Sequence, residues 1–303
     1  MSLTTMDVVY WYLAIRILGR YSLDERVPPL LKKTMHPMGI QKQCKEGLKD
    51  QNKTKNRYIT SPAYDFCRIK LALKDDDPNS SYINASKVPG HKKVYGYIIS
   101  QAPLANTIDD FWKLLWQERI YSIISANNFN GTEYIEYWPK KEGTYGNIDV
   151  LFKHVEVKKY FTIRTFHVKH KDSKNWRELK QFHYTVWPDK IAPENPLSVA
   201  KLLERVNRYN RQYNRPILIH CEAGCGRSGT VLCTDICLHQ ARCDEEVNVF
   251  KALTTLRSQR IDGVETQPQF EFIHKVILEK FFSDDRKDSN MAKKNEPRRM
   301  NNV

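Results

Sequence analysis

Cys221 and Arg227 stand six positions apart in a glycine-rich loop that follows an apolar run, in "PILIHCEAGCGRSGT" at 216–230. The run predicts a buried strand ending at the cysteine, and the residues after the loop predict a helix. That helix would aim its N-terminus and the loop N–H groups at one place, which favours an anion and favours a thiolate over a thiol. We therefore expect the pKa of Cys221 to lie below its ordinary value of about 8.5. Arg227 can hold two phosphoryl oxygens and Ser228 can donate a hydrogen bond to the departing sulfur, so the pattern predicts nucleophilic attack on a phosphate ester.

The same loop carries a weaker pattern, because its glycines at 224–229 have the G-x-G-x-x-G spacing of dinucleotide-binding folds. An acidic residue at 245–246 would then stand about twenty positions on, where a ribose is bound. Against this interpretation, Arg227 would crowd the approach of a pyrophosphate, the motif comes late in the chain, and Cys221 has no use. A third interpretation makes Cys221 an inert thiol at the end of a strand.

A general acid is expected on another loop, because the leaving oxygen of a phosphate ester needs a proton. The segment "FHYTVWPDK" at 182–190 supplies Asp189. A strand is predicted to end at Trp187 and Pro188, so that Asp189 begins a proline-bounded loop. Such a loop is typical of a mobile lid that brings its carboxyl group over a site.

The composition indicates a globular protein with anionic partners. Of 303 residues 41% are apolar, and 49 basic against 35 acidic side chains leave a net charge of +14. The charge favours phosphorylated substrates, nucleic acid or an acidic membrane surface, without choosing among them. The seven cysteines form no C-x2-C zinc pattern. We therefore expect a reducing, cytoplasmic location with no metal and no cofactor.

The stretch at 7–21, "DVVYWYLAIRILGRY", is the one candidate for contact with a membrane. Its apolar part runs only from Val8 to Gly19 and contains Arg16, which is too short to span a bilayer. Asp7 stands where a signal peptide carries positive charge. We expect a packed helix, with a peripheral membrane anchor as the next alternative and a true span or signal after it.

Helical and strand patterns alternate along the rest of the chain and predict a single α/β domain with a twisted mixed sheet flanked by helices. Strands are predicted at 96–103, 121–128, 134–139, 148–157, 160–170 and 215–220, and helices at 109–120, 197–213 and 229–243. We divide the chain into an N-terminal helical and basic segment (1–52), a catalytic domain (53–282) and a disordered charged tail (283–303).

Several motifs of the predicted domain together resemble the catalytic domain of a classical, phosphotyrosine-specific protein tyrosine phosphatase of the non-receptor type. They are "KNRY" at 55–58, "YINAS" at 82–86, "QAPLANTIDDFW" at 101–112, "YWP" at 137–139, "FHYTVWPD" at 182–189 and "HCEAGCGRSGT" at 220–230. The resemblance implies the cysteine phosphatase fold and hydrolysis of phosphotyrosine in proteins, and we expect a monomer that binds no nucleic acid.

By that resemblance Cys221 becomes phosphorylated, Arg227 binds the phosphoryl group, and Asp189 protonates the tyrosine oxygen and then activates water. Tyr58 stacks on the substrate ring and deepens the pocket, which excludes phosphoserine and phosphothreonine. His220 either orients the loop or is an ordinary core histidine. The remaining phosphate-binding positions are the loop backbone of Glu222, Ala223, Gly224, Cys225 and Gly226.

The chain departs from the family pattern at positions that affect rate and specificity. Thr60 replaces an aspartate that grips the peptide backbone, and Lys190 follows the lid aspartate where an aromatic residue is common. The usual Glu and Lys before "YWP" are absent, with Asn128 and Glu133 near those places. Glu222 follows the nucleophile where serine is common, and we expect its side chain to point outward.

A further departure lies in "VETQPQF" at 264–270, where the family has two glutamines that position the hydrolytic water. Gln269 is retained, but Glu265 replaces the first glutamine. A carboxylate there repels an anionic phosphoryl group, unless Gln267 takes its place or Glu265 is protonated. The departures motivate an alternative function, a phosphotyrosine-binding pseudophosphatase with weak turnover. An oxidoreductase or a nucleic-acid binder is less favoured, because the basic residues are scattered.

Overall fold

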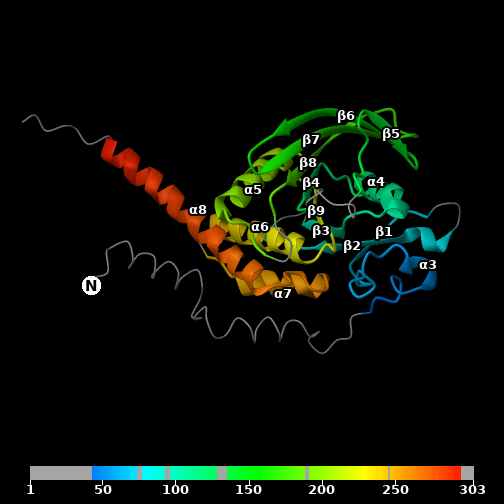
Figure 1. Cartoon of the computed structure of the whole chain (residues 1–303), viewed down its shortest axis with the longest axis horizontal. Helices are drawn as coiled ribbons and strands as arrows, with labels where there is room; N and C mark the ends of the chain where they lie inside the picture. Colours follow the sequence, from blue (N-terminus) through cyan, green and yellow to red (C-terminus); the bar gives the residue numbers. More distant parts are fainter. Residues whose placement is uncertain are drawn as a thin grey trace, which may run out of the picture.

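A computed structural model of the chain describes residues 43–73, 77–92, 96–127, 135–187, 191–244 and 246–294. Within them a single mixed sheet has the strand order β1-β2-β3-β9-β4-β8-β7-β6-β5 (Figure 1). The strands are β1 (Arg68–Lys70), β2 (Tyr82–Val88), β3 (Tyr97–Gln101), β4 (Ser122–Ser125), β5 (Glu142–Tyr145), β6 (Ile148–Val157), β7 (Phe161–His170), β8 (Arg177–Tyr184) and β9 (Ile217–Cys221).

The centre of the sheet is parallel, and both of its wings are antiparallel. Strands β3, β9, β4 and β8 run in the same direction, and the residues of β3, β9 and β4 are buried on both faces, as is typical of parallel strands. Cys221 therefore pairs with Gln101 at the carboxyl edge of the sheet. Ligands of open α/β sheets bind outside this edge, so the register alone places Cys221 where a site is expected.

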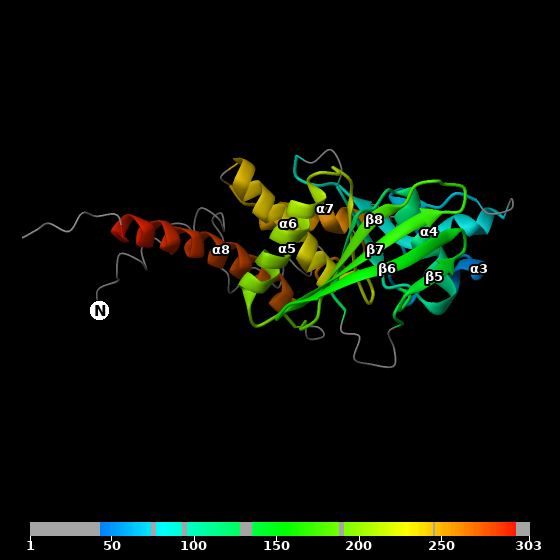
Figure 2. The same cartoon turned by 90° about the horizontal axis from the view of Figure 1, so that it is seen from above.

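Helices cover both faces of the sheet and enclose two apolar cores (Figures 1 and 2). The elements are α3 (Asp50–Lys53), η1 (Pro78–Ser81), η2 (Ala105–Thr107), α4 (Ile108–Gln117), α5 (Pro196–Asn210), α6 (Gly226–Asp244), α7 (Val249–Gln259) and α8 (Gln267–Lys294). Side chains of α5, α6, α7 and α8 share one core with Ile217 and Ile219 of β9, whereas Leu218 between them joins α4 in the other. This alternation follows from the two-residue period of a strand.

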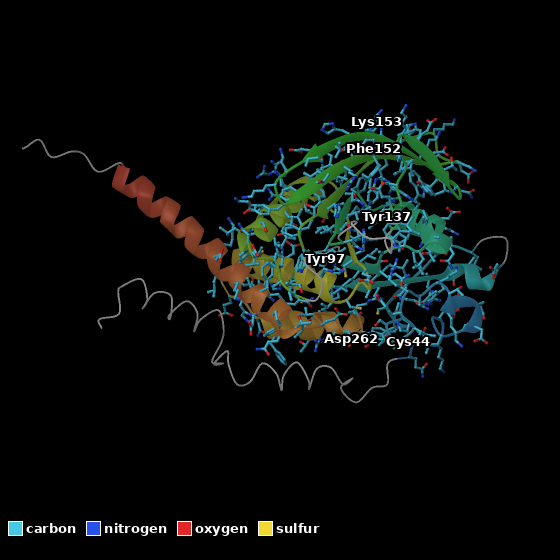
Figure 3. All side chains as sticks on the ribbon, in the orientation of Figure 1. Cys44, Tyr97, Tyr137, Phe152, Lys153 and Asp262 are labelled. Atoms are coloured by element: carbon cyan, nitrogen blue, oxygen red, sulfur yellow. The ribbon has the colours of Figure 1, made fainter. Side chains whose placement is uncertain are left out.

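Two buried tyrosines mark the two faces (Figure 3). Tyr97 lies on the α6 side, where its hydroxyl donates to Asp235 at 2.6 Å. Tyr137 lies on the α4 side, in ring contact with Phe111 of that helix. Polar caps fix where the covering helices begin. Asn195, which immediately precedes the first residue of α5, accepts from the Ser198 amide through its side chain. Asn248 accepts in the same way from the Lys251 amide at the start of α7.

The structure corrects several boundaries predicted from the sequence. Residues 135–139, predicted as a strand, have no strand structure, because Tyr137 turns into the core instead of pairing. The strand predicted to end at Trp187 ends at Tyr184. Helix α8 continues to Lys294, where a disordered tail was predicted from residue 283.

The apolar stretch 7–21 lies outside the described residues, as does most of the segment 1–52. Among the helices that the structure does describe, none is long and apolar enough to cross a bilayer.

Candidate active site

The loop between β9 and α6 is held from outside by its carbonyl oxygens. The Ala102 amide donates to the carbonyls of Cys221 and Glu222, at 2.7 and 3.0 Å. The Cys225 carbonyl accepts from the amides of Gly229 and Val264. Because the carbonyls bind outward and α6 begins at Gly226, the loop presents amide groups and a helix N-terminus on its inner side. The loop is thus built to hold an anion next to Cys221.

Two glycines of this loop lie in close contact with neighbouring groups. Gly224 has a φ of +70°, and a Cβ there would lie 2.3 Å from the Ser100 carbonyl oxygen. A Cβ on Gly226 would lie 2.3 Å from Oε2 of Glu265 and 2.9 Å from the side-chain amide of Gln269. A side chain at Gly224 would thus meet the backbone of β3, whereas one at Gly226 would displace only the flexible ends of Glu265 and Gln269.

The three candidate reactive groups of the loop are buried. Cys221 is 3% exposed, Arg227 is 5% exposed and Ser228 is fully buried. The Ser228 hydroxyl has no hydrogen-bond partner among the described residues, so it is available to a ligand or to the sulfur. Burial raises the pKa of the neighbouring Cys225 thiol to about 12. Cys225 therefore remains a thiol at neutral pH.

The side chain of Glu222 points into the site, so the prediction that it points outward is wrong. One carboxylate oxygen accepts a hydrogen bond from the Tyr58 hydroxyl. The other lies 3.5 Å from Nη2 of Arg227. Arg227 supplies a buried cation and Tyr58 a phenol donor. These two partners take the place of the water that would solvate the carboxylate if it pointed outward.

Tyr58 is positioned by polar contacts of the motifs around it. The Gln101 side chain accepts from the Arg57 amide at 3.0 Å and donates to the Lys55 carbonyl at 2.8 Å. The Asn56 side chain accepts from the Tyr82 hydroxyl at 2.6 Å. These contacts place Tyr58 beside the loop while leaving it 44% exposed. Thr60 is also exposed, on the same segment.

Arg260 holds the outer side of the loop, and sequence reasoning missed it. This fully buried arginine donates to the carbonyls of Gly224 at 3.1 Å and Ala223 at 2.8 Å. It also donates to Oδ1 of Asn84 at 2.5 Å. Nothing in the sequence around Arg260 distinguishes it from a solvated arginine near the end of a helix, so no local signal indicates its role.

Gln269 and Glu265 both reach the start of α6, as the alignment on "VETQPQF" predicted. Gln269 is 1% exposed and accepts from the Glu265 amide at 3.0 Å. Val264, which precedes Glu265, has a φ of +62°, which is strained for a β-branched residue. Arg257 holds this turn by donating to the Val264 carbonyl at 2.6 Å. Gln267 donates instead to Glu271 along α8, so it does not take the place of the missing glutamine.

His220 is a buried, neutral histidine behind the nucleophile. Its Nε2 lies 2.8 Å from the Tyr137 hydroxyl, which accepts from the Gln181 amide at 2.6 Å. Burial lowers the pKa of His220 to about 3, so the imidazole is neutral, and its tautomer sets which of the two groups donates. The ring links the end of β9 to the core on the α4 side, whichever of the two predicted roles it has.

The predicted general acid, Asp189, lies outside the described residues together with Pro188 and Lys190. The residues that flank it are fixed. Trp187 is fully buried against Phe272 of α8, and its indole N–H donates to the Ile191 carbonyl at 3.0 Å. Asn128 and Glu133 also lie outside the described residues.

The sequence profile described as protein-tyrosine phosphatase matches residues 52–279, which run from the end of α3 through all nine described strands into α8. The chain belongs to the protein-tyrosine phosphatase family. The match confirms the family resemblance of the motifs and the predicted fold class. The match also argues against a dinucleotide-binding fingerprint. Such a fingerprint follows the first strand of its domain, whereas this glycine-rich loop follows β9, the last of the described strands.

Relatives of known name agree with this family. The chain is 34% identical over 254 residues to receptor-type tyrosine-protein phosphatase alpha of Homo sapiens. It is 36% identical over 234 residues to tyrosine-protein phosphatase Lar-like of Caenorhabditis elegans, and 38% over 233 to receptor-type tyrosine-protein phosphatase F of Rattus norvegicus. The matches cover 81%, 76% and 75% of this chain but only 32%, 11% and 12% of those proteins. The chain thus spans a third or less of these relatives, two of which are named as receptor-type, and the predicted non-receptor type is not confirmed.

Proposed function

We propose that the chain hydrolyses phosphotyrosine in proteins through a phosphocysteine intermediate. The observation that carries the proposal is that Cys221 and Arg227 are both buried in the loop that joins the carboxyl end of β9 to the start of α6. Family membership supports the same reaction. The groups that would stabilise the developing charge are already oriented in the buried site. Such preorganised stabilisation is usually the largest single contribution to catalysis.

In the first step the thiolate of Cys221 attacks the phosphorus atom, so that an S–P bond forms and the bond to the tyrosine oxygen breaks. Arg227 binds two phosphoryl oxygens, and the inner amides of residues 222–226 stabilise the charge that develops on them. Asp189 gives its proton to the leaving phenol oxygen.

In the second step water attacks the phosphocysteine, and Asp189 takes a proton from that water. The S–P bond breaks, inorganic phosphate leaves, and the Ser228 hydroxyl donates to the departing sulfur. Gln269 is proposed to orient the water, because its side chain is buried against Gly226 at the start of α6. The ring of Tyr58, which stands beside the loop, is proposed to stack on the substrate ring and to exclude the shorter phosphoserine and phosphothreonine.

Turnover of para-nitrophenyl phosphate in a metal chelator tests this function. The purified chain is expected to release nitrophenol catalytically, and Cys221→Ser is expected to abolish turnover. Phosphotyrosine peptide binding should survive in that variant, because Arg227 and the loop amides bind phosphate independently of the sulfur. Cys243→Ser is the matched control, since Cys243 is an exposed free cysteine near the end of α6. Undiminished turnover in Cys221→Ser would sink the nucleophile assignment.

A second candidate function is phosphotyrosine binding with little or no turnover. It is favoured by two carboxylates in the site, Glu222 on Arg227 and Glu265 against Gly226. The same assay separates the two functions. Tight binding of a phosphotyrosine peptide by the unmodified chain, without measurable release of phosphate, would identify a binding protein.

The wider context of the chain remains a proposal as well. We propose a catalytic domain at 53–282, which the profile match at 52–279 supports, in a monomeric cytoplasmic phosphatase of the non-receptor type whose partners are phosphotyrosine proteins. The apolar stretch 7–21 supports peripheral membrane contact at most, because it is short and contains Arg16. Carbonate extraction of cell membranes checks this proposal, since a receptor-type protein would stay with the lipid.

A further inference from the structure

The Glu222 carboxylate contacts the two side chains that a bound phosphotyrosine is expected to contact, Tyr58 and Arg227. It lies 3.5 Å from Nη2 of Arg227 through one oxygen and accepts from the Tyr58 hydroxyl through the other. The Glu222 side chain is 16% exposed although it stands at the mouth of the loop. The carboxylate therefore bridges Arg227 and the Tyr58 hydroxyl.

A carboxylate on an arginine is chemically a partial substitute for a phosphoryl group. Both are anions with oxygens that accept from the planar guanidinium. Arg227 cannot satisfy both partners with the same donors, and two anions side by side in a buried site repel each other. Entry of phosphate therefore requires the Glu222 side chain to leave Arg227.

We propose that Glu222 is an intramolecular competitor of the substrate, which occupies Arg227 in the empty site and rotates away when a phosphoryl group binds. This inference rests on the proposed function only in naming phosphotyrosine as the substrate. A phosphate monoester displaces the carboxylate because it carries almost two negative charges and three terminal oxygens, against one charge and two oxygens. The consequence is a weaker apparent affinity for every phosphate ligand, with no change in the chemical step once the ligand is bound.

The opposite possibility is that Glu222 is a positioning residue, which holds Tyr58 and Arg227 in the orientation that the substrate needs. The two roles predict opposite signs. Removal of a competitor strengthens phosphate binding, whereas removal of a positioning residue weakens it. The measured sign therefore decides between them without any assumption about magnitude.

Calorimetric binding of inorganic phosphate is the direct test, because it needs no turnover. Glu222→Gln is expected to lower the dissociation constant for phosphate by about threefold to thirtyfold, the range expected for a half-buried ion pair. Glu142→Gln makes the same change of charge at an exposed position of β5 and should leave the constant unaltered. Glu222→Ser is a second variant that removes the carboxylate completely, and near-ultraviolet circular dichroism establishes that both variants are folded.

A double-mutant cycle examines the second contact of the carboxylate. Tyr58→Phe keeps the aromatic ring but removes the hydroxyl that holds Glu222, so phosphate should bind more tightly than to the unmodified chain. In the Glu222→Ser background the same change should have no effect, because no carboxylate remains to be released. An equal effect of Tyr58→Phe in both backgrounds would show that the hydroxyl acts independently of Glu222.

The outcome for activity keeps this inference separate from the proposed function. If the chain turns over para-nitrophenyl phosphate, Glu222→Gln should lower KM by the same factor as the phosphate constant and leave kcat within about twofold. If the chain has no turnover, the proposed function fails, but tighter phosphate binding by Glu222→Gln still supports the competitor. Unchanged or weaker phosphate binding by both Glu222 variants overturns the competitor, whatever the activity is.

Discussion

Arg260, directly after α7, and Asn84, in β2, are joined by a buried hydrogen bond of 2.5 Å that ties the phosphate loop to the wing of the sheet. The same guanidinium donates to the carbonyls of Ala223 and Gly224, so one side chain serves three acceptors. Those two carbonyls point away from the anion site because Arg260 binds them. The inward direction of the loop amides thus depends on Arg260, which lies far from the nucleophile in the sequence.

Arg260→Lys should therefore impair both folding and phosphate binding. Lysine keeps the charge but cannot serve three acceptors with a planar fork, so at least one buried carbonyl loses its partner. We expect the free energy of unfolding to fall by about 1 to 3 kcal/mol, the usual effect of an unsatisfied buried group, and kcat/KM to fall more than about tenfold. Urea unfolding and steady-state kinetics measure the two effects. Arg211→Lys, at an exposed position after α5, is the control that should change neither.

Asp189→Ala should lower kcat without weakening substrate binding. Loss of a general acid costs about two to four powers of ten in rate. The dissociation constant of a phosphotyrosine peptide, measured in the Cys221→Ser background, should stay within about threefold. A rate equal to that of the unmodified chain would remove Asp189 from the mechanism.

Glu265→Gln should accelerate hydrolysis of the phosphocysteine. Two like charges about 4 Å apart repel by about 1 kcal/mol in water and about 4 in a partly buried site, which slows the second step roughly tenfold to a thousandfold. Rapid mixing with an aryl phosphate should show a stoichiometric burst of phenol followed by a slow steady state. Only the slow phase should become faster in Glu265→Gln. A linear time course that the substitution leaves unchanged would make Glu265 a bystander.

Thr60→Asp should improve the recognition of peptides but not of small substrates. Thr60 is exposed on the segment that carries Tyr58, where a carboxylate can accept from the backbone amides of a bound peptide. We expect KM for a phosphotyrosine peptide to fall about threefold to tenfold, as one charge-assisted hydrogen bond would give. KM for para-nitrophenyl phosphate should hardly change, and an equal effect on both substrates would contradict the assigned role.

Two buried histidines should make stability depend on pH below about 6. Burial lowers the pKa of His183 to about 4 and that of His220 to about 3. Each is neutral in the folded chain but protonated in the unfolded chain below its ordinary pKa of about 6.5, so unfolding takes up protons and stability falls as pH falls. Together they should contribute about 2 kcal/mol per pH unit to the loss between pH 5.5 and 4.5.

His183→Gln separates one histidine from the carboxylates that titrate in the same range. The slope of the unfolding free energy against pH should decrease by about 1 kcal/mol per pH unit. Urea unfolding at several pH values gives the slope. His154→Gln at an exposed position of β6 is the comparison variant, and an equal slope in all three proteins would disprove the linkage.

The sequence by itself determined the family, the strand, loop and helix around Cys221, and the alignment that brings Glu265 and Gln269 to that loop. These features depend on local patterns: a buried apolar run, glycines at fixed positions and a helix after them. Local patterns also placed most of the central strands, because strands buried on both faces read as continuous apolar runs.

Only the tertiary structure decided how Tyr137, Glu222 and Arg260 are used. Tyr137 stands in an apolar segment that looks like a strand, but the segment turns into the core, where the Tyr137 hydroxyl shares a hydrogen bond with the buried His220. Glu222 points inward because Tyr58, 164 positions away, and Arg227 offer it partners. Arg260 is buried because its three acceptors come from β2 and from the loop. The direction of a polar side chain depends on which donors and acceptors the fold brings within about 3 Å, and contacts across such separations leave no periodicity in the sequence.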